Sequence, residues 1–270
     1  MINEFPRTLP APLKRFLTNA VGVLSSDPRV VGVAAGGSFI TDTMDEFSDL
    51  DLVIVGDASG HPGLLADRVR LAESLGSLLA AFSGEHVAEP RLLVCLYEGE
   101  HPLHVDLKFV SVVDLAVRVE NPVVLWERDA VLTRALSDGA AAYPPPSYQW
   151  IEDRFWVWVH YATSKVGRGE LFEAHDFLAY LRGAVLGPLA LARAGLRPSG
   201  VRHLERLPAG DVDLLRGTVA GMSREEAIRA LRASISAYRA LRPSDGSVLF
   251  RAAAERAAMS YLEHVEASAA

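Results

Sequence analysis

Residues 30–55, VVGVAAGGSFITDTMDEFSDLDLVIV, organise the first half of the chain. An apolar run ends in Gly36-Gly37-Ser38, and after a gap of ten residues Asp49-Leu50-Asp51 opens a second apolar run. Apolar runs bounded by small and polar residues predict strands, here over about 29–35 and 50–56. If Asp49 and Asp51 alternate with leucines along the second strand, both carboxylates project from the same face.

Two carboxylates on one face indicate a cation between them, because two negative charges at so short a distance repel each other. A hard divalent ion such as Mg²⁺ takes one or two carboxylates together with phosphate oxygens, so the pair predicts a site for a metal-bound nucleoside triphosphate. Taken alone, each motif is more often a solvated strand end or an ordinary turn. The order of the two motifs along one short span is what favours the metal site.

Gly36-Gly37-Ser38 followed by Asp49-Leu50-Asp51 resembles the signature of the polymerase-beta-like nucleotidyltransferases, in particular the bacterial enzymes that adenylylate aminoglycoside and lincosamide antibiotics. The resemblance implies that the glycine–serine turn holds triphosphate oxygens and that the two aspartates bind Mg²⁺. It also implies a third carboxylate on a later strand.

The stretch HPLHVDLKFVSV, residues 101–112, contains a candidate for that third carboxylate. Apolar and polar residues alternate there, which predicts a strand with Asp106 on its polar face. Asp106 is thus the third catalytic and metal-binding candidate, either as a metal ligand or as the acceptor of a proton. Without the upstream motif, an edge strand with one solvent-exposed face explains the pattern equally well. Glu89 competes for the role, but Pro90 predicts a loop at that point.

Composition limits the classes of partner. The chain has 270 residues, half of them apolar, which is enough for a substantial core and two domains. A net charge of −7 argues against a nucleic-acid partner, which needs clustered Lys and Arg, and favours a cationic small molecule. Cys95 is the single cysteine, so we expect a buried apolar residue and no disulfide.

The first residues lack the charged and apolar segments of a signal peptide, and no apolar span is long enough for a bilayer. We therefore expect a cytoplasmic protein with no membrane partner.

The two halves of the chain differ in the elements that they predict. In the first half we expect helices over 11–25, 39–44 and 61–82, and strands over 91–98, 103–110 and part of 121–129, which together indicate a mixed sheet. Three prolines at 144–146 mark a boundary. The prediction is an α+β protein with a nucleotidyltransferase domain over 1–142 and a helical bundle over 148–270.

The bundle is expected to contain helices over 148–167, 170–195, 210–221, 223–241 and 247–267. Ser223 and Glu226 form a predicted capping box at the start of the fourth.

One stripe of the first bundle helix carries aromatic and basic side chains at helical spacing: Arg154, Trp158, Tyr161 and Lys165. Tyr161 and Lys165 are candidates for stacking on an adenine and contacting phosphate, although packing between domains also explains the stripe. Four polar residues follow on the next helix, where they either line a pocket for amino groups or favour the helix start through its dipole: Glu170, Glu173, His175 and Asp176. A general-base role for His175 is the weaker interpretation.

The function that these residues predict is transfer of AMP from ATP, with two Mg²⁺ ions, to a hydroxyl of a small molecule, foremost an aminoglycoside-type antibiotic. Other acceptors remain open, namely a lincosamide, a metabolite or a protein side chain. A regulatory module that binds nucleotide without turnover is the alternative outside the enzyme class.

Overall fold

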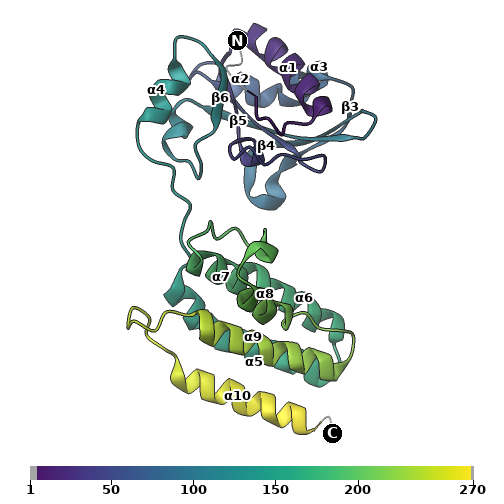
Figure 1. Cartoon of the computed structure of the whole chain (residues 1–270), viewed down its shortest axis with the longest axis vertical. Helices are drawn as coiled ribbons and strands as arrows, with labels where there is room; N and C mark the ends of the chain where they lie inside the picture. Colours follow the sequence, from purple (N-terminus) through teal and green to yellow (C-terminus); the bar gives the residue numbers. More distant parts are fainter. Residues whose placement is uncertain (1–4, 269–270) are drawn as a thin grey trace. The chain divides into compact units, whose positions relative to one another are not determined.

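The computed structural model describes residues 5–268, and the chain divides into two compact units with the boundary between Ala142 and Tyr143 (Figure 1). The first unit contains six strands and several helices and 3-10 turns: α1 (Ala11–Ser26), β1 (Val30–Ala35), η1 (Gly37–Phe39), β2 (Leu50–Gly56), α2 (His61–Ala66), α3 (Arg68–Leu75), β3 (Leu78–Gly84), η2 (Glu85–Val87), β4 (Glu89–Tyr97), β5 (Leu103–Ser111), η3 (Val113–Ala116), β6 (Val123–Glu127) and α4 (Val131–Ser137).

The six strands form one mixed sheet in the order β3-β4-β5-β2-β1-β6. β2 and β5 run parallel, and the other neighbouring pairs run antiparallel. The α+β class and the mixed sheet predicted from the sequence are confirmed. The parallel pair lies in the middle of the sheet, where the period-two alternation of β2 and β5 buries one set of side chains completely.

Each face of the sheet has its own apolar cluster. On one face, α1 and α3 pack against the apolar side chains of the central strands, among them Leu52 and Leu107. On the other face, Val55 and Val110 pack with Leu132 of α4. Because side chains alternate along a strand, Asp51 and Asp106 belong to this second face.

The predicted helix over 61–82 is wrong in its last third. α3 ends at Leu75, Gly76 is extended, and Leu78–Gly84 form the edge strand β3, which pairs with β4. Leucine and alanine favour a helix by propensity, but pairing with β4 outweighs that weak preference.

Two further expectations in the first unit need correction, and one helix was missed. The predicted helix over 39–44 is wrong: the 3-10 turn η1 ends at Phe39, and Asp42 has a positive φ of 52°, which a helix does not continue through. Glu89 and Pro90 lie in β4 and not in a loop; proline is tolerated at the start of a strand, here beside an irregularity in the β3–β4 register. Helix α4 was not predicted, because its seven residues are too few for a clear helical period.

The second unit is helical, as predicted. Its elements are α5 (Tyr148–Arg168), α6 (Leu171–Leu181), the π-helical turn η4 (Arg182–Leu186), α7 (Gly187–Arg193), η5 (Leu204–Arg206), α8 (Ala209–Arg216), α9 (Arg224–Leu241) and α10 (Ala252–Ala267). The capping box of Ser223 and Glu226 at the start of α9 is confirmed. The expected helix over 170–195 is interrupted by η4, and those expected over 210–221 and 247–267 are shorter.

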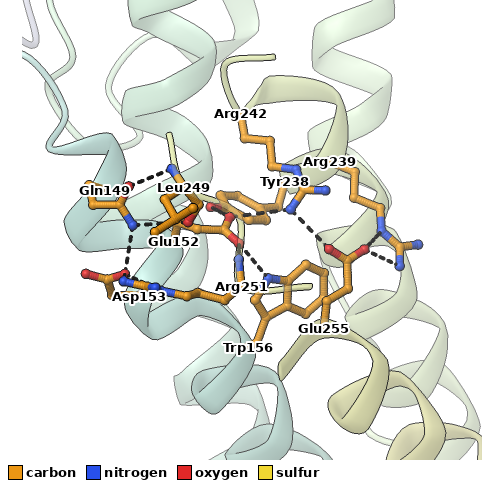
Figure 2. A network of polar contacts seen from close by, with 10 residues as sticks. All are labelled: Gln149, Glu152, Asp153, Trp156, Tyr238, Arg239, Arg242, Leu249, Arg251 and Glu255. Atoms are coloured by element: carbon orange, nitrogen blue, oxygen red, sulfur yellow. Dashed lines mark hydrogen bonds and ion pairs between the residues drawn. The ribbon is translucent and has the colours of Figure 1, made fainter. Parts of the chain in front are cut away.

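A buried carboxylate ties the helices of this unit together (Figure 2). Glu152 of α5 is fully buried and accepts hydrogen bonds from Trp156 Nε1 at 3.1 Å, from Tyr238 Oη of α9 at 2.6 Å and from the backbone N–H of Arg251 at 2.8 Å. Arg242 lies 3.4 Å away and supplies positive charge. These partners satisfy both oxygens, so the carboxylate has a structural role.

Within residues 5–268, every helix is too short or too polar to cross a membrane.

Candidate functional site

The parallel pairing of β2 with β5 brings two of the predicted acids together. Asp51 and Asp106 are direct partners in the register, and both side chains are partly buried. Neighbouring strands lie about 4.8 Å apart, and register partners project from the same face. Two carboxylates from segments far apart in the sequence are therefore neighbours on one face of the sheet.

The Gly36–Gly37 turn follows β1 and lies against Asp51. The N–H of Gly36 donates to the backbone oxygen of Asp51 at 3.0 Å, which holds the turn on β2. Gly37 has a φ of 60°, and a Cβ there would overlap Oδ2 of Asp51. Glycine is thus required at this position both for the backbone conformation and for the approach of the Asp51 carboxylate. Ser38 follows within η1 and is half-buried.

Asp49 lies one residue before β2, which begins at Leu50. The strand alternation expected to align both aspartates therefore positions Asp51 but does not by itself position Asp49. The side chain of Asp49 is half-buried in the segment that leads into the strand.

The two candidates for the third carboxylate have different surroundings. Asp106 Oδ1 lies 3.1 Å from Nε2 of His104, on the same face of β5. Glu89 lies 2.7 Å from Nε of Arg91 and 2.8 Å from Nζ of Lys108. The hydrogen bond from Arg91, followed by that from Lys108, lowers the pKa of Glu89 to about 2. Glu89 is neutralised by two cations, whereas Asp106 lies beside Asp51, so the geometry favours Asp106.

Glu120 is a site residue that the sequence did not predict. Its Oε1 accepts a hydrogen bond from the backbone N–H of Gly37 at 3.0 Å. Glu120 lies in the loop before β6, and β6 pairs with β1, whose end leads into the turn. The loop has no periodicity that could have indicated this contact, because the contact depends on a pairing between distant segments.

The chemistry of these side chains fits a hard cation such as Mg²⁺. Asp51 and Asp106 present neighbouring carboxylate oxygens, the ligand type that this ion prefers. Among the side chains of residues 5–268, no three from His, Cys, Asp or Glu are grouped closely enough to hold a metal ion alone. Mg²⁺ commonly binds one or two carboxylates and completes its coordination with phosphate oxygens and water, so a third protein ligand is not required.

Tyr161 and Lys165 lie on α5 in the second unit, among acidic partners. Nζ of Lys165 is 3.0 Å from Glu170 and 3.0 Å from Glu173, and it lies over the ring of Tyr161. The hydroxyl of Tyr161 donates to Glu173. The contact with Glu173, then that with Glu170, raises the pKa of Lys165. Arg168 lies 3.9 Å from Glu170, so two cations balance the two carboxylates and this group of side chains is close to neutral.

The other polar candidates of the second unit have structural partners. The guanidinium of Arg154 stacks on the ring of Trp150 at 4.3 Å. Nε2 of His175 lies 2.7 Å from the backbone oxygen of Gly221, so the ring is tied to the chain and is not positioned as a free base. Asp176 lies on α6.

Comparison with known proteins bears on the first unit. Residues 17–111 match the family model of the nucleotidyltransferase domain. The chain contains a nucleotidyltransferase domain. The matched segment includes the glycine turn, β2 and β5, so the turn and the paired acids lie within the domain, and the expectation of a nucleotidyltransferase enzyme is confirmed.

Two solved structures are similar to most of the chain. An aminoglycoside 6-adenyltransferase from Bacillus subtilis is 14% identical, with 92% of this chain and 97% of that chain covered and a TM-score of 0.40. A nucleotidyltransferase-like protein from Exiguobacterium sibiricum is 14% identical, with 84% and 75% covered and a TM-score of 0.37. Similarity at this level does not define a substrate. None of the curated protein sequences compared with the chain matches it.

Proposed function

We propose that the chain transfers AMP from ATP to a hydroxyl group of a small molecule. The observation that carries the proposal is the pairing of Asp51 with Asp106 beside the Gly36–Gly37 turn, inside a nucleotidyltransferase domain. Nucleotidyl transfer needs little covalent chemistry from the protein. It needs in-line positioning of the reactants and neutralisation of charge on the phosphate oxygens, which paired carboxylates with bound cations and a glycine-lined turn are suited to provide.

Each residue has a defined role in this proposal. Asp49 and Asp51 would hold one Mg²⁺, and Asp106 would hold a second ion with them or accept the proton of the attacking hydroxyl. When bound, Mg²⁺ offsets charge on the triphosphate and lowers the pKa of the acceptor hydroxyl. Backbone N–H groups of Gly36, Gly37 and Ser38 approach the triphosphate because small residues leave room. In the structure the N–H of Gly36 donates to the backbone oxygen of Asp51 and the N–H of Gly37 donates to Glu120. A triphosphate oxygen that binds either group must displace these partners.

The bond changes follow from the reaction class. The acceptor oxygen bonds to the α-phosphorus while the bond from that phosphorus to the β-phosphate oxygen breaks, so pyrophosphate leaves with the electron pair. The hydroxyl proton passes to Asp106 directly or to water. His104, 3.1 Å from Asp106, orients this carboxylate by a hydrogen bond.

We infer a cationic acceptor of the aminoglycoside type, whose modification would confer antibiotic resistance. The net charge of −7 attracts cations. Tyr161 and Lys165 remain candidates for nucleotide contact. Lys165 would have to exchange a carboxylate for a phosphate oxygen, since both acids now hold it.

The experiment uses the purified full chain with ATP labelled at the α-phosphate, MgCl₂ and a panel of aminoglycosides and lincosamides. Pyrophosphate release together with label and one added AMP on the drug, detected by mass spectrometry, supports the proposal. Asp106→Asn should abolish the signal, while Glu100→Gln, a change in the exposed β4–β5 loop, should preserve it. Label on the protein itself would favour a protein acceptor. Nucleotide binding without pyrophosphate release from any acceptor would favour the regulatory alternative.

A further inference from the structure

The carboxylate of Glu120 occupies a hydrogen-bond donor of the glycine turn. The N–H of Gly37 points to Oε1 of Glu120 at 3.0 Å. This contact joins residues 83 positions apart, and the pairing of β6 with β1 brings them together, with Val123 opposite Ala35 just outside the turn. The same turn is the segment that the proposed function assigns to the triphosphate.

Glu120 and Asp51 approach the turn closely enough to crowd it. A Cβ on Gly36 would lie 2.8 Å from Oε1 of Glu120 and 3.6 Å from Cβ of Asp51. Two acidic side chains thus border one small residue. The Asp51 carboxylate also lies against Gly37, so negative charge from both side chains is close to the same turn.

A carboxylate oxygen and a phosphate oxygen use the Gly37 N–H in the same way. Both are anionic acceptors, and a single N–H group directs its one hydrogen to one strong acceptor at a time. A triphosphate oxygen that binds this N–H must therefore displace Glu120. The negative charge of Glu120, if it stays beside the turn, also repels the incoming phosphate.

We propose that Glu120 is a nucleotide-site residue that competes with the triphosphate for the Gly37 N–H and so weakens nucleotide binding. The inference rests on the proposed function, because it takes the glycine turn as the binding site of the triphosphate. Binding then requires the Glu120 side chain to leave the turn, and the observed dissociation constant equals the intrinsic one divided by the fraction of molecules in which Glu120 has left it. Removing the carboxylate removes this competition.

The opposite role makes the opposite prediction. If Glu120 instead helped to hold the nucleotide through a bound cation, its removal would weaken binding. Binding is therefore measured by isothermal titration calorimetry in EDTA, without divalent metal, with inorganic tripolyphosphate and ATP as the two probes. Under these conditions a metal-mediated contribution of Glu120 is absent and the competition is observed directly.

The variants are Glu120→Ala, Glu120→Gln and the control Glu100→Ala on the β4–β5 loop. Glu120→Ala should bind both probes roughly 10-fold more tightly than the wild type. Glu120→Gln keeps an uncharged acceptor and should show a smaller gain, and the control should bind as the wild type does. Circular dichroism and thermal unfolding verify that each variant is folded. If Glu120→Ala does not fold, the test rests on Glu120→Gln, whose side chain is nearly the same size as that of the wild-type residue.

The outcomes separate this proposal from the proposed function. Unchanged or weaker binding by the folded Glu120 variants, with binding by the wild type intact, overturns the competition and leaves the nucleotide site standing. Tighter binding by the variants supports both. If neither the wild type nor any variant binds tripolyphosphate or ATP, even after Mg²⁺ is added, the nucleotide site itself is refuted and the competition with it.

Discussion

Asp51 on β2 and Asp106 on β5 are direct register partners across the parallel pair at the centre of the sheet. Parallel neighbours carry their side chains on the same face, so a slip of one residue would turn one of the carboxylates to the opposite, apolar face. The buried alternation of Leu52 and Leu107 on that opposite face prevents the slip. The core of the domain thus determines the spacing of the two acids.

This relationship predicts that each acid can be neutralised without loss of the fold. Asp51→Asn and Asp106→Asn should each lower the rate of nucleotidyl transfer by roughly 100-fold or more, because each removes a group that acts on charge in the transition state. Thermal unfolding should change little, since both side chains are only partly buried and the amide is nearly the same size. Full activity in Asp51→Asn would show that the paired acids are not the catalytic centre.

Replacing Gly37 should harm the protein more than its positive φ alone would explain. Gly37→Ala places a Cβ against the Asp51 carboxylate and forces an alanine into a φ of 60°. Gly139 is a matched control, because it also has positive φ but has open space around its Cα. Gly139→Ala should destabilise the protein by about 1–2 kcal/mol in chemical unfolding, and Gly37→Ala by at least as much, because the Asp51 carboxylate must also move.

Only Gly37→Ala should also reduce activity, measured as pyrophosphate release under the same conditions. An equal loss of activity in both variants would mean that backbone strain, and not the approach of Asp51, is responsible.

The strands of the site could be predicted from sequence, because their information is local. Alternation of apolar and polar residues located β2 and β5 and assigned Asp106 to the polar face of its strand. The same reasoning failed at Leu78–Gly84, where leucine and alanine favour a helix but an available strand partner determines the structure. Propensity is a weak preference that pairing can outweigh.

The contact of Glu120 with Gly37 could not be predicted, for a different reason. It depends on β6 pairing with β1, and no local pattern specifies which strands become neighbours. The contact of Glu89 with Lys108 depends in the same way on the pairing of β4 with β5. Lys165, by contrast, contacts Glu170 and Glu173, which follow it closely in the sequence. Sequence indicates which side chains are polar and on which face they lie, whereas the partners follow from the topology.

Glu89 predicts a pH dependence of stability in the first unit. Hydrogen bonds from Arg91 and then Lys108 lower its pKa from an ordinary 4.5 to about 2. A depressed pKa stabilises the folded state above the unfolded pKa, and this contribution is lost as the pH falls from about 4.5 towards 2. Glu89→Gln should therefore cost about 1–2 kcal/mol at pH 7 and progressively less below pH 4.5.

Urea unfolding of both proteins at pH 7 and at pH 3 gives this comparison, with Glu100→Gln as an exposed control. A difference between wild type and Glu89→Gln that stays constant across this range would contradict the assignment.

Glu152 predicts the largest loss of stability in the second unit. Its fully buried carboxylate receives hydrogen bonds from Trp156, Tyr238 and the N–H of Arg251, and these partners come from three separate segments (Figure 2). Glu152→Ala leaves buried donors and a cation without an acceptor, which should cost about 3–5 kcal/mol in chemical unfolding. Glu263→Ala, at an exposed position on α10, should change stability by less than about 0.5 kcal/mol. Similar small losses in both variants would mean that water replaces the carboxylate and that the apolar packing of α5 with α9 and α10 holds the unit together.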